Sequence, residues 1–467
     1  MDKSYFFYSM SDVYLPVQYH IERWSEDELS RGSWSQLLVH GSPEDRAILG
    51  SPFSDNFILA GEACDSDFPA MVHGAVLSGH RAADWAVESL SSSSSSSSSE
   101  GGGRVVAVIG AGAAGLAAAG RIRRLRGGGV KVVLLEARDR IGGRIKTINL
   151  GGDEGEGSAV MVDAGATWLH HAEENHLVPM ARELGLTLVE SVFSNALNAA
   201  QDGGDAENVY AMIGQLSCEA QRAVIANGNK DMSLESALSS FISSCSKADQ
   251  RRARMALDEI RADSGIDFNL ISAKYALEEP GVGAGDLYMK EGYSALLTAI
   301  LKGVGSNDFP PQKDEDDGIQ VRLNTLVTAI DWSDAAQVKL VTASGKILVV
   351  DRCICTLPIS LLQPPSIVSI HPPLPLPQST ALSRMKMSTC DKVLLRFERR
   401  WWPVSPGGIL HWYGVEEKEG AGTNTDWIEW LDLTDGVGAP VVMAFIAGIS
   451  CTLVTEWMPS GRLYICF

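Results

Sequence analysis

The sequence predicts a mixed α/β fold centred on a parallel βαβ unit, and three neighbouring segments support this prediction. Residues 104–109 form a short apolar run rich in β-branched residues, which is typical of a buried strand. A glycine-rich turn and an alanine-rich helix over 116–125 follow, and a break of three glycines ends the helix. A second apolar run, residues 130–135, completes the unit.

Patterns further along the chain predict the remaining elements. Apolar residues at helical spacing predict helices over 234–245 and 251–261, within a largely helical region. A turn at 343–346 between two alternating segments predicts a hairpin over 339–350. Three further apolar stretches predict strands over 393–397, 427–433 and 441–447.

Length and composition limit the classes of protein that the chain can belong to. With 467 residues it has room for two to four domains at roughly 100–200 residues each. A hydrophobic content of 45% excludes general disorder. The 39 basic and 58 acidic residues give a net charge of −19, which disfavours a nucleic-acid partner. Two interpretations of this acidic charge stay open: it attracts small cationic ligands, or it only keeps the protein soluble.

Cysteine usage and terminal segments indicate a reduced compartment. The eight cysteines form no CxxC pair, and Cys353 and Cys355 lie in an apolar run, so we expect buried thiols and no metal site. Apolar stretches fall short of the ~20 residues that a membrane span needs. The first residues do not resemble a signal peptide, and Phe467 ends no peroxisomal signal. We expect a cytoplasmic protein; a peroxisomal or nuclear location and the oligomeric state stay open.

The turn after the first strand has the spacing of a dinucleotide-binding loop. Gly110 permits the tight turn, Gly112 lets the backbone approach a pyrophosphate, and Gly115 lets the helix pack closely on the strand. Amide groups at the start of the helix favour the negative charge of phosphate. Glu136 ends the second strand, 26 residues after Gly110, where a carboxylate binds the hydroxyl groups of adenosine ribose.

The residues after Glu136 favour FAD over NAD. A Gly142–Gly143 pair between Arg138 and Arg144 can surround a second stretch of pyrophosphate. This segment resembles the GG-doublet flavoproteins, and most closely the flavin-dependent amine oxidase family. The resemblance extends through residues 162–170 and through a GY-x-x-L element at 292–296.

The resemblance implies a GG-doublet, Rossmann-like FAD-binding domain interleaved with an α+β substrate-binding domain. It assigns 46–90, 104–170 and 286–362 to the FAD domain, and 1–45, the helical region 171–285 and the sheet region 363–467 to the substrate domain. It implies non-covalent FAD, because no cysteine stands at 32–35 where some members attach flavin. The residues expected to hold FAD are Gly61, Glu62, Met71, Val72, Ala75, Gly110, Gly112, Ala114, Gly115, Glu136, Ala137, Arg138, Gly142, Gly143, Arg144, Ala166, Thr167, Trp168 and Val327.

Three residues are candidates for catalysis by the same resemblance. Lys392 aligns with a strand lysine that holds a water near flavin N5, and the flanking CTLP and PPLP segments support the alignment. Trp402 stands where the family has an aromatic-Trp-Pro segment. Phe68 stands where many members have a tyrosine that forms one wall of an aromatic slot over the flavin.

The order of the segments is permuted relative to the family. Residues 57–86, with Glu62 and a His73–Ala75 turn, resemble the family's closing motif, which normally lies near the C-terminus. Here they precede the nucleotide loop, joined to it by a serine- and glycine-rich linker at 91–103. Residues 1–20 match no part of the family pattern. Circular permutation and fusion of the end of one gene copy with the start of the next both explain this order.

The predicted function is FAD-dependent oxidation of amines, with polyamines as the expected substrates. Hydride transfer to flavin N5 gives an imine that water hydrolyses, and molecular oxygen reoxidises the flavin to yield hydrogen peroxide. One alternative is a lysine-specific histone demethylase-like oxidase. Another is a non-catalytic or misassembled remnant of an amine oxidase.

Overall fold

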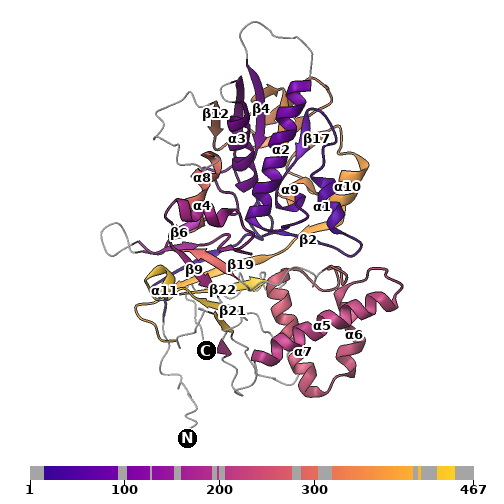
Figure 1. Cartoon of the computed structure of the whole chain (residues 1–467), viewed down its shortest axis with the longest axis vertical. Coiled ribbons are helices and arrows are strands. Elements are labelled where there is room, and N and C mark those ends of the chain that lie inside the picture. The colour runs from indigo at the N-terminus through magenta and orange to yellow at the C-terminus, as the bar shows by residue number, and fades with distance from the viewer. Residues whose placement is uncertain are drawn as a thin grey trace.

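We describe the fold from a computed structural model of the whole chain (Figure 1). The residues that the structure describes are 15–92, 103–126, 129–151, 159–191, 197–198, 206–275, 285–302, 318–402, 409–411 and 429–447. The predicted linker therefore lies mostly outside the described residues. Its first two serines, however, belong to the end of helix α2 (Val72–Ser92).

A five-stranded parallel sheet contains the predicted βαβ unit. Its strand order is β12 (Ile319–Arg322), β5 (Val130–Leu135), β4 (Arg104–Ile109), β16 (Arg352–Cys355) and β3 (Phe57–Leu59). Every neighbouring pair is parallel. The two strands predicted at 104–109 and 130–135 are confirmed at the same residues. The edge strand β3 comes from the segment that precedes the serine run.

Two helices cover one face of this sheet and join the two chain segments. Helix α2 lies beside α3 (Ala113–Arg126) in Figure 1. An ion pair connects them, with Arg121 Nε 2.6 Å from Asp84 Oδ1. Val106 and Val108 of β4 pack in the same core cluster as these helices. The helix expected at 116–125 thus exists, although it begins three residues earlier.

The opposite face of the parallel sheet contacts a small second layer. This layer has the order β15 (Ile347–Val350), β14 (Val338–Thr342), β13 (Val327–Asp331) and β17 (Ser369–His371). Ala107 and Ile109 of β4 share a core cluster with Val338 and Leu340. Strands β14 and β15 are antiparallel, which confirms the hairpin predicted over 339–350.

A second large sheet lies below the first in Figure 1. Its order is β1 (Gln18–Glu22), β19 (Cys390–Arg396), β22 (Val441–Ala447), β21 (Glu429–Asp432), β20 (Ile409–His411) and β10 (Leu197–Asn198). Strands predicted near 393–397, 427–433 and 441–447 correspond to β19, β21 and β22, with residues 427–428 outside the described part. Residues 18–20, for which no element was predicted, belong to β1, which pairs with β19.

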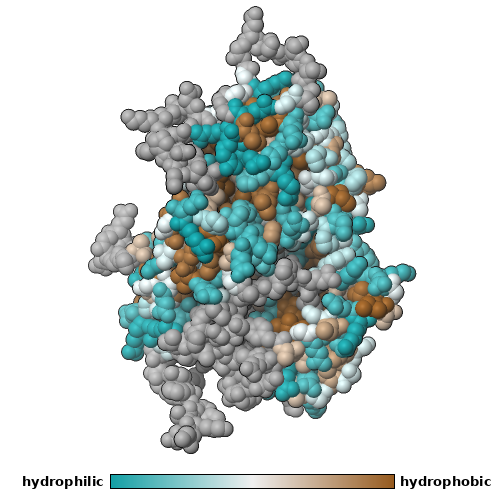
Figure 2. Space-filling view, in the orientation of Figure 1, coloured by the Kyte–Doolittle hydropathy of each residue, from teal (hydrophilic) through white to brown (hydrophobic). Residues whose placement is uncertain are grey.

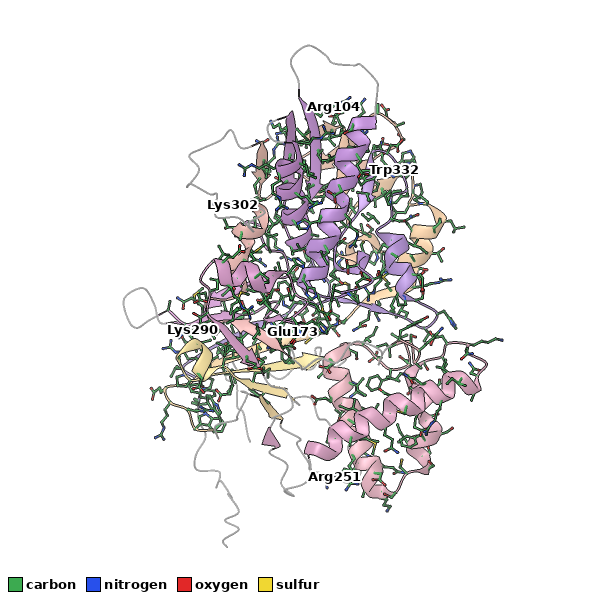
Figure 3. All side chains as sticks on the ribbon, viewed as in Figure 1. Arg104, Glu173, Arg251, Lys290, Lys302 and Trp332 are labelled. Atoms are coloured by element: carbon green, nitrogen blue, oxygen red, sulfur yellow. The ribbon has the colours of Figure 1, made fainter. Side chains whose placement is uncertain are left out.

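Three helices form a lobe with a core of its own. They are α5 (Ala206–Ala226), α6 (Leu234–Ser244) and α7 (Lys247–Ser264), and their buried side chains include Leu216, Leu238 and Ala253. Figure 3 shows Arg251 of α7 in this lobe, at the opposite end of the view from Arg104 at the start of β4. The lobe reaches the second sheet through α7, which contacts β22.

The region 171–285 is less uniformly helical than expected. It contains α4 (Leu177–Glu183) and the lobe, but also β9 (Leu188–Ser191). Strand β9 forms a small sheet with β11 (Asp286–Met289) and β8 (Trp168–Leu169).

The remaining elements are short. They are β2 (Ser35–Leu37), α1 (Pro43–Leu49), β6 (Thr147–Asn149), β7 (Met161–Asp163), α8 (Leu297–Lys302), α9 (Ile359–Leu362), α10 (Leu376–Ser383), β18 (Met385–Met387), α11 (Thr434–Val437) and 3₁₀ turns at Glu62–Cys64 and Tyr293–Leu296. On the face shown in Figure 2, apolar residues show in separate patches among hydrophilic ones. Among the described residues, none of the helices is both long and apolar enough to cross a membrane.

Candidate active site

A cavity of about 350 Å³ lies where the two chain segments and the two large sheets meet. Residues on both sides of the serine run line it, from Trp24 to Ala75 and from Ile109 to Phe445. This volume falls in the range of small-molecule and cofactor sites. The segments that the sequence separates therefore form one continuous pocket.

The predicted nucleotide loop lines the cavity between β4 and α3. Gly110 has a φ of +97°, and a Cβ there would approach Thr356 Oγ1 to 2.6 Å, so only glycine fits. A Cβ on Gly115 would lie 1.8 Å from the Gly110 carbonyl oxygen. Gly115 does not line the cavity; it permits the close packing of the helix on the loop, which was its expected role.

Glu136 is fixed by backbone amides at the end of β5. Its two carboxylate oxygens accept hydrogen bonds from Ala111 N at 2.7 Å and from Arg138 N at 2.9 Å. The Arg138 guanidinium is held in turn by Asp27, 2.7 Å away, on the segment before the serine run. These contacts place one carboxylate and one guanidinium at the same end of the cavity.

The glycine pair docks onto the nucleotide loop. Gly142 N donates to the Ala111 carbonyl oxygen at 2.8 Å, and both Gly142 and Gly143 have positive φ. Arg144, which follows directly, forms an ion pair of 3.0 Å with Glu62. Arg144 and the two glycines all line the cavity.

Glu62 is buried among cationic and hydroxyl donors. Its Oε2 accepts a 2.6 Å hydrogen bond from Ser35 Oγ, which is itself held by Arg46. Burial acts to raise the pKa of Glu62, but Arg144, Arg46 and the Ser35 hydrogen bond outweigh it, so the pKa lies below its ordinary value. The surroundings of Glu62 therefore favour its anionic form in the cavity wall.

Lys392 lies on β19 and lines the same cavity. Its Nζ donates to the Gly165 carbonyl oxygen and to Thr167 Oγ1, and the residue is 7% exposed. The same Nζ lies 5.6 Å from the Trp168 ring centre and 5.2 Å from that of Phe445. A buried ammonium thus faces two aromatic rings across the cavity wall.

Most of the residues predicted from the sequence meet in this one cavity. Those that line it are Gly61, Glu62, Met71, Val72, Ala75, Gly110, Gly112, Ala114, Glu136, Ala137, Arg138, Gly142, Gly143, Arg144, Ala166, Thr167, Trp168, Val327 and Lys392.

Two predicted catalytic residues lie away from the cavity lining. Phe68 packs against His73, with ring centres 4.5 Å apart. Trp402 packs against Phe397 and Trp401, in a core cluster with side chains of the second large sheet. Phe68 is not among the described residues that line the cavity, whose lining does include the aromatic side chains of Trp24, Trp34, Trp168 and Phe445.

Several lining residues were not predicted as site residues. Phe445 stands on a strand for which no site residue was predicted, and Asp263 belongs to α7 of the helical lobe. His170, which lines the cavity, is oriented by Asp286, 2.9 Å from its Nδ1. The CTLP segment, whose Thr356, Leu357 and Pro358 line the cavity, could have been found because the resemblance already included it.

The donor set around the cavity fits a dinucleotide cofactor. The first residues of α3, Ala113 and Ala114, and of α2, Val72 and Ala75, line the wall, so two positive helix ends face the interior. The glycine loop leaves room for phosphate, and Glu136 suits a ribose diol. Among the described residues, no cluster of His, Cys, Asp or Glu is arranged to hold a metal ion.

Comparison with known proteins identifies the family. The sequence model described as flavin containing amine oxidoreductase matches residues 8–86 and 113–456. The chain belongs to this family. FAD is therefore the cofactor of this protein. The match also begins at residue 8, within the segment 1–20 for which no resemblance was expected.

Relatives in plants include amine-oxidising enzymes and demethylases. "Probable polyamine oxidase 4" of Arabidopsis thaliana is 30% identical over 364 residues, covering 73% of this chain and 66% of the relative. "Lysine-specific histone demethylase 1 homolog 1" of the same plant is 27% identical, covering 73% and 39%. "Polyamine oxidase 4" of Oryza sativa subsp. japonica is 27% identical, covering 73% and 67%. The chain thus spans about two thirds or less of the relatives' lengths.

Proposed function

We propose that this protein oxidises amines with non-covalent FAD and that linear polyamines are its substrates. The observation that carries the proposal is the cavity itself, because its lining includes both the nucleotide loop and Lys392 with two aromatic rings. The 30% identity to a relative named as a polyamine oxidase supports the substrate class. The net charge of −19 favours cationic substrates.

The cofactor and the protein have separate tasks in this proposal. FAD, when bound, supplies the two-electron oxidation of the amine C–N bond to an imine and passes the electrons to oxygen, giving hydrogen peroxide. Gly110, Gly112 and Ala114 bind the pyrophosphate, and Glu136 binds the adenosine ribose. Arg144 adds positive charge beside the pyrophosphate and is oriented by Glu62.

In this proposal, Lys392 and the residues around it bind and orient the amine substrate. The Trp168 and Phe445 rings pack against each other with their centres 5.7 Å apart, and together they give the amine an aromatic wall beside Lys392. Lys392 holds a water molecule and donates a hydrogen bond at the reacting edge. Its contacts with Gly165 and Thr167 fix the ammonium in place.

The same proposal includes the domain assignment and the permuted order. Residues 46–90, 104–170 and 286–362 form the FAD-binding half, and the other assigned ranges form the substrate half. The parallel pairing of β3 with β16 supports the inclusion of 46–90 in the FAD half.

The purified protein provides the test. We expect the visible absorbance of oxidised flavin in the isolated protein, and peroxide formation with spermine or spermidine. A Lys392→Met variant is expected to keep the flavin absorbance and lose most of the peroxide formation. Peroxide from a methyl-lysine peptide but not from polyamines would favour the demethylase-like alternative, and a folded, colourless protein would favour the non-catalytic remnant.

A further inference from the structure

The small sheet of β8, β11 and β9 connects a buried hydroxyl group to an aromatic residue of the candidate active site. Ser191, the last residue of β9, is 3% exposed, and its Oγ accepts a hydrogen bond of 3.0 Å from Trp168 Nε1. Trp168 stands on β8 and lines the cavity, whereas Ser191 is not among the described residues that line it. Because β11 lies between β8 and β9, this hydrogen bond crosses the sheet.

A cross-strand pair in this sheet holds two neighbouring residues of the cavity lining. Ser191 lies directly opposite Asp286 of β11 in the antiparallel register, and Asp286 is 2% exposed. Asp286 Oδ2 lies 2.9 Å from Nδ1 of His170, the residue two positions after Trp168. The ring centres of Trp168 and His170 lie 6.0 Å apart, so Ser191 and Asp286 each hold one of two adjoining rings. The small sheet thus orients part of the cavity lining.

The Trp168 ring connects this sheet to the residues around Lys392. Its centre lies 5.7 Å from that of Phe445, with 37° between the ring planes, and 5.6 Å from Lys392 Nζ. An indole has a single donor, the Nε1–H group, which usually finds a partner inside a protein. Because Ser191 accepts from this group, a rotation of the Trp168 ring about its side-chain bonds breaks the hydrogen bond. The Ser191 hydroxyl therefore favours one orientation of the aromatic wall.

We infer that Ser191 is a positioning residue, which orients the Trp168 ring against the amine substrate and so determines how efficiently the amine is oxidised. This inference rests on the proposed function and makes it more specific. Ser191 takes no part in the chemistry itself and acts through the Trp168 Nε1–H group. Loss of its hydroxyl lets the aromatic wall turn and the amine shift, and a shift of about 1 Å can slow a reaction by up to ~10²-fold.

A double-mutant cycle of Ser191→Ala and Trp168→Phe tests this role. Phenylalanine keeps an aromatic ring at position 168 but has no N–H group, so Trp168→Phe removes the hydrogen bond by itself. The measured quantity is the limiting rate of flavin reduction by spermidine divided by the apparent Kd, from anaerobic rapid mixing. Ser191→Ala alone is expected to lower this ratio roughly tenfold. Added to Trp168→Phe, it is expected to change the ratio less than about twofold, because the two residues act as one unit.

Nuclear magnetic resonance of protein with ¹⁵N-labelled tryptophan follows the contact itself without turnover. Trp168→Phe identifies the Trp168 Nε1–H signal by its disappearance. Ser191→Ala is expected to shift this signal and to speed its exchange with solvent. Ser272→Ala is the matched control, because it removes a fully buried serine hydroxyl that donates to Asp231 in the helical lobe, outside the described cavity lining. It is expected to leave the Trp168 signal and the reduction ratio unchanged.

The outcomes separate this inference from the proposed function. If Ser191→Ala lowers the reduction ratio equally with and without Trp168→Phe, or does not lower it at all, the positioning role of Ser191 is overturned. If no amine reduces the flavin of the unaltered protein, the proposed function fails. Calorimetric titration of the same four proteins with spermidine then decides the role of Ser191. A change in Kd that requires Trp168 supports it, and an equal or absent change overturns it.

Discussion

At the residue scale, Glu62 accepts hydrogen bonds from both chain segments at once. Ser35 reaches it from the segment before the serine run, and Arg144 from the segment after it. Arg46, which is 2% exposed, donates a hydrogen bond to Ser35 Oγ, so a second guanidinium group lies near the Glu62 carboxylate. Because Arg46 is buried and Arg144 is only partly exposed, the stability of the folded protein depends on the negative charge of Glu62.

Glu62→Gln is expected to destabilise the protein by about 3–5 kcal/mol, the usual effect of breaking a buried ion pair. The amide keeps the size of the side chain but leaves Arg144 and Arg46 without their anion. Urea unfolding followed by tryptophan fluorescence measures the change. Glu183→Gln, an exposed residue on α4, is the control and should change stability little. A loss below 1 kcal/mol for Glu62→Gln would contradict this account.

The predicted site residues that line the cavity include three that share a local signature. Gly110, Gly112 and Glu136 are fixed by a turn and a strand end, which short-range spacing specifies. Phe68 and Trp402 depended on where a loop places a side chain. In the structure Phe68 turns to His73, and Trp402 joins an aromatic cluster. Asp263 lay beyond prediction because its position depends on how the helical lobe docks.

At the scale of elements, α2 and α3 approach each other closely at a glycine. A Cβ on Gly79 of α2 would lie 2.2 Å from the Ala114 carbonyl oxygen of α3. Ala114 also lines the cavity, so the packing of the two helices and the shape of the cofactor site are coupled.

Gly79→Ala and Gly214→Ala should change stability in opposite directions. The first forces α2 away from α3, so we expect lower stability and loss of flavin during gel filtration. The second lies in α5, where an added Cβ meets no heavy atom within 4 Å. Replacing a glycine inside a helix should stabilise by about 0.5–1 kcal/mol there. Melting temperature and retained flavin report both effects, and equal shifts in the same direction would refute the packing argument.

The predicted elements were correct where local patterns suffice. Strands β4 and β5 and the β14–β15 hairpin follow from β-branched runs and turn residues. Strand β1 was missed because its five residues, QYHIE, alternate only weakly, and its pairing with β19 joins residues more than 350 positions apart. Such long-range pairing is decided by the packing of the whole chain.

At the scale of the whole molecule, the buried His73 and the half-buried His80 make stability depend on pH. Burial lowers the pKa of His73 to about 3, and His176, His170 and His171 act in the same direction. Burial and Arg121 lower the pKa of His80 to about 4. These groups stay neutral in the folded protein and become protonated in the unfolded chain near pH 6.5. Their contribution is complete above pH 6.5 and is lost as the pH falls toward 4 and 3.

We therefore expect the free energy of unfolding to decrease below pH 6.5, by up to about 1.4 kcal/mol per pH unit for each such histidine. Asp163 has an opposite, smaller effect on this pH dependence. Burial raises its pKa to about 6, so the free-energy penalty of burying its charged form decreases as the pH falls below that value. Urea unfolding at pH 7.5, 6.5 and 5.5 measures the slope. His80→Gln should reduce it, and an unchanged slope would argue against the contribution of His80.

The contacts between the two chain segments should hold them together without the linker. Strand β3 pairs with β16, α2 packs on α3, and Glu62 pairs with Arg144, so the interface includes backbone hydrogen bonds, a buried core and an ion pair. Once both pieces are folded, the linker contributes mainly effective concentration.

Replacing part of the serine run with a protease recognition sequence tests this directly. After cleavage, we expect the two fragments to elute together in gel filtration with flavin bound, and to separate only in denaturant. An uncleavable linker of the same length is the control. Such an assembly would mean that the order of the segments does not determine the active site, since β3, α2 and Glu62 reach their positions through the packing alone. Fragments that separate in native buffer, with release of flavin, would show instead that the covalent connection is needed to keep the cavity closed.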